Sequence, residues 1–206
     1  MVKKQTQRPQ PTWAPIFEGI RKVVYGDPLF PRHLTSVPNV PISLLYKGEL
    51  RDSDSISVAV VGSRRASPAG KQRAYRLAAE LVDAGITVVS GLAEGIDGAA
   101  HRGTLAAGGR TIAVMGTGLN HVYPQTHEEL FSQIIQQGAA LSQFVPGFTG
   151  YRSGRNFLQR NHVLVGMAQV LVVVEAEERS GSAAAIRAAL DCGRPVGMIR
   201  SLVETK

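Results

Sequence analysis

The chain has 206 residues, which is enough for one domain with a substantial core and too few for two full ones. Hydrophobic residues make up 44% of the chain and aromatic residues only 6%, so we expect a core of Val, Ile, Leu and Ala, as in α/β proteins. Lysine and arginine outnumber aspartate and glutamate by 23 to 16, and the resulting charge of +7 favours an anionic partner such as nucleic acid or nucleotide phosphate.

The cysteine content and the lengths of the apolar runs indicate the cellular compartment of the protein. The single cysteine, Cys192, excludes an intramolecular disulfide and a cysteine-based metal site, and it is typical of a reducing compartment. The N-terminal segment carries Lys3, Lys4 and Arg8 without the apolar run of a signal peptide, and no apolar run approaches the length of a membrane span. We therefore expect a cytoplasmic protein with no metal and no membrane partner.

The N-terminal part of the chain differs in composition from the rest. The first 15 residues are rich in proline, glutamine and basic residues and lack apolar periodicity. Four prolines then interrupt the short apolar runs between Ile16 and Leu50, which predicts an irregular lead-in packed on the core. We expect residues 1–26 to be a flexible basic arm and lead-in, and residues 27–206 to form one domain.

Short β-branched runs alternate with segments of helical spacing from Val58 onward. Their near-continuous apolarity predicts strands buried on both faces, joined by crossover helices in a doubly wound, mostly parallel sheet. In such α/β folds ligands collect at the carboxyl ends of the strands. The expected strands are Val58–Val61, Ile86–Ser90, Thr111–Met115, Gln169–Val174 and Pro195–Ile199, with a weaker one at Ala139–Ser142.

The first of these strands ends in Gly62-Ser63-Arg64-Arg65, before an expected helix. Glycine lets a backbone approach a ligand, the serine hydroxyl and free helix N–H groups can bind phosphate oxygens, and arginine supplies a bidentate fork. This pattern is typical of a phosphate cradle. The alternative is an ordinary strand-to-helix turn with solvated arginines.

The second strand leads into the segment from Ser90 to His101, in which we expect Gly91 to approach the nucleic acid. Its spacing matches neither the dinucleotide fingerprint nor the P-loop, so we expect no cofactor. Asp97 and His101 lie four residues apart and could hydrogen-bond on one helix face, or Asp97 could simply favour the start of a helix. We assign both a structural or supporting role and expect no catalytic site.

The third strand is followed by Gly116, Gly118 and Tyr123. The glycines allow close approach of a backbone to a ligand. Tyr123 could stack on a base or pack beneath the loop.

Arginines and an aromatic residue gather before the next apolar helical run. Cations beside an aromatic ring and an amide suit single-strand binding, although arginines on a solvated helix face are the alternative. The residues are Arg152, Arg155, Phe157, Arg160 and Asn161.

The strand ending at Val174 is followed by Glu175 and then by Ser180-Gly181-Ser182, which opens an alanine-rich helix. Hydroxyls and N–H groups at a helix start form an anion site, and the neighbouring carboxylate could support it. Polar groups suited to phosphate thus follow four strands, a convergence that favours one binding site.

Taken together, these blocks resemble the DprA/Smf (DNA-processing protein A) family over residues 27 to 199. The serine-to-histidine block after the second strand is the most specific of them. The blocks are Val60–Arg64, Val89–Asp97 with Ala100-His101, Thr111–Gly118 with Tyr123-Pro124, Arg160-Asn161 with Gly166, and Val173–Ala176 with Ser180–Ser182, and Leu44–Gly48 fits as a lead-in.

The resemblance implies an extended Rossmann-like domain that binds single-stranded DNA in a basic pocket. It further implies a dimer that helps load a RecA-type recombinase in natural transformation (competence), recombination or repair, without covalent chemistry. The family's DNA-contacting arginine falls on Arg64, and its basic segment on Arg160 and Asn161.

The chain departs from the family pattern in three places. Leu158 stands where the family usually has proline, and Gln143 where it commonly has an acidic residue. The sequence also stops soon after Ile199, so we expect a short form without the C-terminal winged-helix-like domain.

The sequence is consistent with three candidate functions. The first is binding of single-stranded DNA with affinity that falls steeply with salt. The second is sensing or processing of a small nucleotide; here the block that hydrolytic relatives carry is missing around Glu175, which disfavours hydrolysis. The third, an oligomeric scaffold for a recombinase, leaves the strand-end arginines unexplained.

Overall fold

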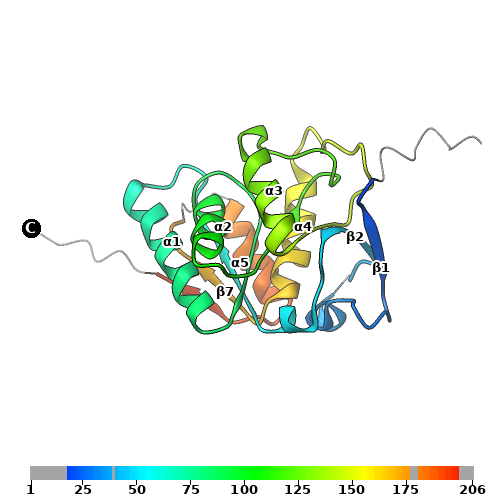
Figure 1. The fold of residues 1–206 in the computed structure, drawn as a ribbon, viewed down its shortest axis with the longest axis horizontal. Helices are drawn as coiled ribbons and strands as arrows, with labels where there is room; N and C mark the ends of the chain where they lie inside the picture. Colours follow the sequence, from blue (N-terminus) through cyan, green and yellow to red (C-terminus); the bar gives the residue numbers. More distant parts are fainter. Residues whose placement is uncertain (1–17, 39, 177–180, 200–206) are drawn as a thin grey trace, which may run out of the picture.

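The computed structural model describes residues 18–38, 40–176 and 181–199 (Figure 1). Their backbone is built around one eight-stranded sheet with the strand order β1-β2-β6-β5-β4-β3-β7-β8. The strands are β1 (Arg21–Val24), β2 (Ser43–Gly48), β3 (Ser57–Val61), β4 (Thr87–Ser90), β5 (Thr111–Met115), β6 (Ala139–Ser142), β7 (Val170–Val173) and β8 (Val196–Met198). The six strands expected from Val58 onward are confirmed to within one or two residues.

The first two strands correct the expectation of an irregular lead-in. β1 pairs with β2, and β2 pairs with β6, both in antiparallel register, whereas every pairing across the sheet from β6 to β8 is parallel. The prolines between Ile16 and Leu50 lie outside both strands, so they interrupt the segment without preventing two short strands from forming. Residues 1–17 of the expected arm lie outside the described residues.

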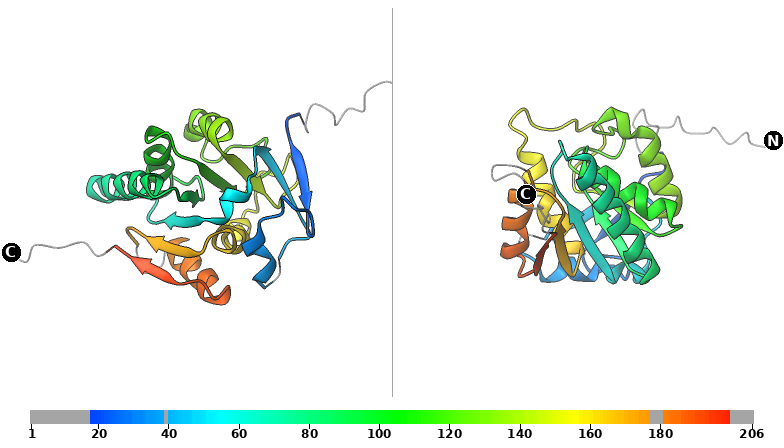
Figure 2. Two further views of the ribbon diagram at one scale, coloured as in Figure 1. Left: turned by 60° about the horizontal axis from the view of Figure 1, so that its bottom comes forward. Right: turned by 90° about the vertical axis from the view of Figure 1, so that its left-hand side faces the viewer.

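Five α-helices cover the sheet of the described chain in two layers (Figure 2). Three of them, α1, α2 and α3, lie on one face, and α4 and α5 lie on the other beside a short 3₁₀ helix at Arg32–Ser36. This arrangement confirms the α/β, doubly wound, mostly parallel fold. The helices are α1 (Pro68–Asp83), α2 (Ile96–Ala106), α3 (Glu128–Gln137), α4 (Arg155–Met167) and α5 (Gly181–Asp191).

The burial pattern follows from the residue types. All five residues of β3 and all five of β5 are buried, as continuous β-branched and apolar runs covered on both faces require. Ser67 caps α1 by accepting a hydrogen bond from the N–H of Gly70, and Pro68 occupies the first helical position. No helix of the described residues is long and apolar enough to cross a bilayer.

The strand order reverses at β3, and this reversal positions the site. From β3 the chain runs through β4 and β5 to β6 on one side, and it then returns to place β7 and β8 on the other. The chain leaves β3 toward α1 on one face of the sheet, and it leaves β7 toward α5 on the opposite face. Connections that diverge in this way open a crevice at the carboxyl ends of the two strands.

Candidate nucleic-acid interface

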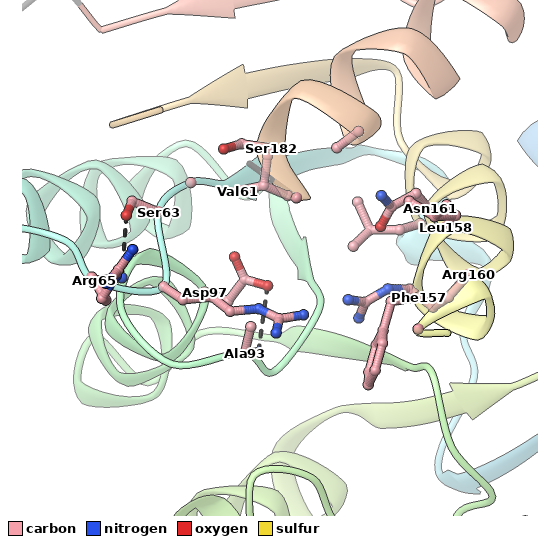
Figure 3. Close-up of a pocket in the computed structure, with 16 residues that line it drawn as sticks. Val61, Ser63, Arg65, Ala93, Asp97, Phe157, Leu158, Arg160, Asn161 and Ser182 are labelled. Atoms are coloured by element: carbon pink, nitrogen blue, oxygen red, sulfur yellow. Dashed lines mark hydrogen bonds between the residues drawn. The ribbon is translucent and has the colours of Figure 1, made fainter. Parts of the chain in front are cut away.

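A cavity of about 460 Å³ lies in this crevice (Figure 3). It is bounded by the turn after β3, the start of α2, one side of α4 and the first turns of α5. Most of the residues that the sequence assigned to binding or support meet here, from four separate connections. The predicted residues in its wall are Gly62, Ser63, Arg64, Arg65, Asp97, Phe157, Arg160, Asn161, Gly181 and Ser182.

Arg64 stands at the mouth of this cavity with its side chain exposed. Its guanidinium carbon lies 5.3 Å from the centroid of the Phe157 ring, within cation–π distance. The Phe157 ring in turn lies 5.7 Å from the ring of Tyr123, which is half exposed. A cation and two aromatic rings therefore form one continuous surface. Arg64 makes no ion pair with a carboxylate of the described residues.

The turn that carries Arg64 is held by backbone contacts from two other elements. Ser63 receives a hydrogen bond on its carbonyl from the Ile96 N–H at 3.2 Å and donates its own N–H to the Glu175 carbonyl at 2.6 Å. A side chain on Gly62 would lie 2.5 Å from Ile96 and 2.7 Å from that same carbonyl. The glycine is therefore required by internal packing, which places the arginines rigidly at the rim.

Glu175 braces the start of α1. Its two carboxylate oxygens accept hydrogen bonds from the backbone N–H of Ser67 at 2.9 Å and from the Ser67 hydroxyl at 2.7 Å. These bonds lower the pKa of the Glu175 carboxyl. Because both oxygens are engaged by the protein, the geometry gives Glu175 a supporting place beside the cavity.

Arg160 enters the cavity wall from α4 but is only 5% exposed. Its guanidinium donates to the carbonyl of Gly91 at 2.6 Å and to that of Val114, so it joins the ends of β4 and β5. Burial lowers the pKa of Arg160 to about 10, which leaves it positively charged at neutral pH. Its Nε has no partner among the described residues.

Asp97 lies beside Arg160 at the start of α2. Its carboxylate accepts from the N–H groups of Gly91 at 3.1 Å and Ala93 at 3.4 Å. Burial raises the pKa of the Asp97 carboxyl, and the charge of Arg160 opposes that rise. A side chain on Gly91 would collide with both the Arg160 guanidinium and the Asp97 carboxylate, so this glycine too is required by packing.

The hydrogen bond considered between Asp97 and His101 is not formed. The buried His101 binds the Thr111 hydroxyl through Nδ1 at 2.7 Å, and that hydroxyl donates to the Val88 carbonyl. Nδ1 must therefore carry the proton of the imidazole. Burial lowers the pKa of His101 to about 3, and Asp97 occupies the first turn of α2, as the helix-start alternative requires.

Several predicted residues are placed elsewhere. Gly118 packs on the Val145 carbonyl and donates its N–H to Phe148, outside the cavity walls. Arg155 is exposed at the first position of α4 and does not line the cavity. Gly91 lines a smaller neighbouring cavity together with Arg64 and Tyr123. Ser180 lies outside the described residues.

Asn156 is a buried residue of this region that the sequence motifs did not single out. Its Nδ2 donates to the Gly116 carbonyl at 2.8 Å, and its Oδ1 accepts from the Tyr151 N–H at 3.1 Å. These bonds fix the start of α4, so that Phe157 and Arg160 face the strand ends. The four-residue spacing from Asn156 to Arg160, on one helix face, is the signal that could have revealed it.

A family model described as DNA recombination-mediator protein A matches residues 21–206. The chain belongs to this family. The resemblance to DprA/Smf proteins is thereby confirmed, and the match begins before residue 27 and includes both antiparallel strands. Protein Smf of Escherichia coli K12 is 40% identical over 171 residues, which are 81% of this chain and 44% of that protein.

Solved structures of DprA proteins share the fold. DprA from Streptococcus pneumoniae superposes with a TM-score of 0.84 at 35% identity, covering 93% of this chain and 66% of that one. DprA from Helicobacter pylori, whose structure concerns its single-stranded DNA binding mode, has a TM-score of 0.79 at 26% identity, covering 90% and 82%. The chain thus spans less than half the length of the E. coli relative.

Proposed function

We propose that this DprA/Smf family member binds single-stranded DNA at the carboxyl ends of its parallel strands. The observation that carries the proposal is the surface of Arg64, Phe157 and Tyr123. In this surface an arginine without a carboxylate partner lies over the partly exposed Phe157 ring, which lies beside the exposed Tyr123 ring. On such a surface the aromatic rings can stack on bases, and the arginine can bind the phosphate backbone of a single strand. DprA from H. pylori, which shares this fold, binds the same ligand.

The cavity beside this surface adds groups that suit a nucleotide. Arg65 is exposed at its rim, and the charge of Arg160 lies in its wall. The Asn161 amide makes no hydrogen bond within the described residues, so it can pair with a base or phosphate. At Gly181, the first residue of α5, a side chain would meet open space, so a ligand can approach that helix start closely.

The finer parts of the function follow from the family. We propose that the bound strand is protected and handed to a RecA-type recombinase, that the protein acts as a homodimer in the cytoplasm, and that it catalyses no reaction. Family membership supports these assignments. These assignments come from family members that are longer than this chain.

Titration of a fluorescent thymine oligonucleotide of about twenty nucleotides tests the proposal, because that length exceeds one single-strand site. Arg64→Glu should abolish most of the binding, whereas Arg76→Glu, the same charge reversal on an exposed residue of α1 outside the cavity, should keep it. An Arg64→Glu variant that binds as the wild type would refute the proposed site. Displacement of the oligonucleotide by a mononucleotide would favour the small-nucleotide sensor instead.

A further inference from the structure

A second basic groove lies next to the strand-end cavity, between α1 and α2. It has a volume of about 510 Å³, and the cations in its wall are Arg64, Lys71 and Arg102. Among the described residues that line it, Glu94 is the single acid. Lys71 and Arg102 are exposed and make no ion pair within the described residues. The groove thus presents a net excess of uncompensated positive charge.

The packing of the two helices creates this groove at their N-terminal ends. Gly103 of α2 lies directly against the backbone of Tyr75 of α1, which brings the helices together at that level. Nearer the strand ends, the groove wall includes Pro68 at the first position of α1 and Gly95, the N-cap of α2. Both helix dipoles therefore add positive potential to the groove.

The floor and one wall of the groove offer groups that suit a nucleotide. Arg102 and the His127 ring both lie against Gly98, where a side chain would displace them. His127 binds the Leu92 carbonyl through Nδ1 at 3.0 Å, and the ring nitrogen must donate this bond because a carbonyl only accepts. Tyr75, which is 37% exposed, supplies an aromatic face in the wall.

Arg64 connects the groove to the site already described. It lines the strand-end cavity, the small cavity beside Tyr123 and the groove between α1 and α2. A polyanion that reaches Arg64 from the strand ends therefore meets Lys71 and Arg102 next along the surface. Because Arg64 is shared, the cations of the cavity and of the groove form one continuous basic surface.

We propose that the groove between α1 and α2 is a second subsite for the same single strand, in which Lys71 and Arg102 bind backbone phosphates beyond the nucleotides at Phe157. This inference rests on the proposed DNA binding and extends it. Phosphate is the shared chemistry of a continuing strand and of a free nucleotide. The subsite is assigned to the strand because the groove is open rather than closed and shares Arg64 with the strand-end cavity, so that a strand can continue from one to the other.

The test compares wild type with the double variant Lys71→Gln/Arg102→Gln on a ladder of thymine oligonucleotides of about 4 to 20 nucleotides, the range of single-strand site sizes. The variant should bind the shortest oligonucleotides as the wild type does and lose the gain in affinity that longer ones provide. Two lost phosphate contacts should lower the slope of log K against log salt by about 1.4 and weaken binding of the long oligonucleotide about 25-fold at 0.1 M salt. Lys22→Gln/Arg76→Gln, an equal charge change on exposed residues outside the groove, is the matched control.

Three results would overturn the subsite. The first is a double variant that binds the long oligonucleotide with the affinity and the salt dependence of the wild type. The second is an equal loss of affinity for oligonucleotides of every length. The third is saturable binding of thymidine monophosphate that the double variant abolishes while its affinities for the oligonucleotides stay those of the wild type. Because binding of the wild type and of Arg64→Glu is measured in the same series, failure of DNA binding itself is distinguished from failure of the groove.

Discussion

The Arg64 guanidinium carbon lies 5.3 Å from the Phe157 ring, although the two residues follow different strands of the sheet. The contact affects both residues. The ring holds the arginine side chain at the rim of the cavity, and the arginine supplies charge beside a surface on which a base can stack. The charge and stacking contributions can be separated by mutation.

Phe157→Leu should weaken binding of a thymine oligonucleotide by roughly 5- to 150-fold, the equivalent of about 1–3 kcal/mol for one base stack. The salt dependence of binding should stay as in the wild type, because no charge is removed. Arg64→Gln should instead lower the slope of log K against log salt by about 0.7. Fluorescence titrations at several salt concentrations measure both, and a reduced slope in Phe157→Leu would contradict the stacking role.

Arg160→Lys should lower the free energy of unfolding by roughly 3 kcal/mol. A lysine keeps the charge, but its shorter side chain would leave the Gly91 and Val114 carbonyls without the donor that Nη1 of Arg160 supplies to both. It would also bury an ammonium group, which is more strongly hydrated than a guanidinium. Urea unfolding measures the change. Arg155→Lys, the same substitution at an exposed position of the same helix, should stay within about 0.5 kcal/mol of the wild type. Equal stabilities for the two variants would show that the buried guanidinium does not hold the strand ends.

Gly91→Ala should destabilise the fold by about 1–3 kcal/mol, because the added methyl group collides with Arg160 and Asp97. Gly181→Ala provides the contrast, since its methyl group would meet open space at the start of α5. That variant should be as stable as the wild type or slightly more stable. Thermal unfolding of the two proteins tests the pair, and a stable Gly91→Ala would mean that the strand ends can shift apart.

His101 should make the protein lose stability as the pH falls. The folded state keeps the imidazole neutral down to a pKa of about 3, whereas the unfolded chain takes up a proton below its ordinary value of 6.5. Between these values the unfolded state binds more protons, so this residue lowers the free energy of unfolding by about 2 kcal/mol from pH 7 to pH 5. His101→Leu should show a smaller pH-induced loss in urea unfolding. An unchanged difference between pH 7 and pH 5 would rule out His101 as its source.

The sequence predicted the parallel part of the fold because its strands are continuous β-branched runs. It also predicted which residues meet, since the carboxyl ends of parallel strands share one edge, and Gly62, Phe157 and Gly181 do line one cavity. β1 and β2 were missed because their short runs lie among prolines and are completed by pairing with β6, a partner remote in sequence.

The sequence predicted which residues lie in the site better than it predicted what each residue does there. Gly62 and Gly91 were interpreted as approaches for a ligand, yet protein atoms from α2, α4 and the segment after β7 fill the space beside them. Arg160 has the same residue type as Arg64 but is buried among carbonyls rather than exposed at the rim. Such differences depend on which side of α4 faces the strand ends, and Asn156 fixes that orientation through contacts that sequence spacing alone does not reveal.

The brace between Glu175 and Ser67 spans 108 residues of the chain. During synthesis the turn carrying Arg64 therefore emerges from the ribosome well before the residue that anchors it, and before β7, the second neighbour of β3. Contacts this distant in sequence form late, once most of the domain is available. A nascent chain that ends before β7 exposes its arginines without the geometry of the site, so we expect the proposed nucleic-acid surface to form only when the domain is nearly finished.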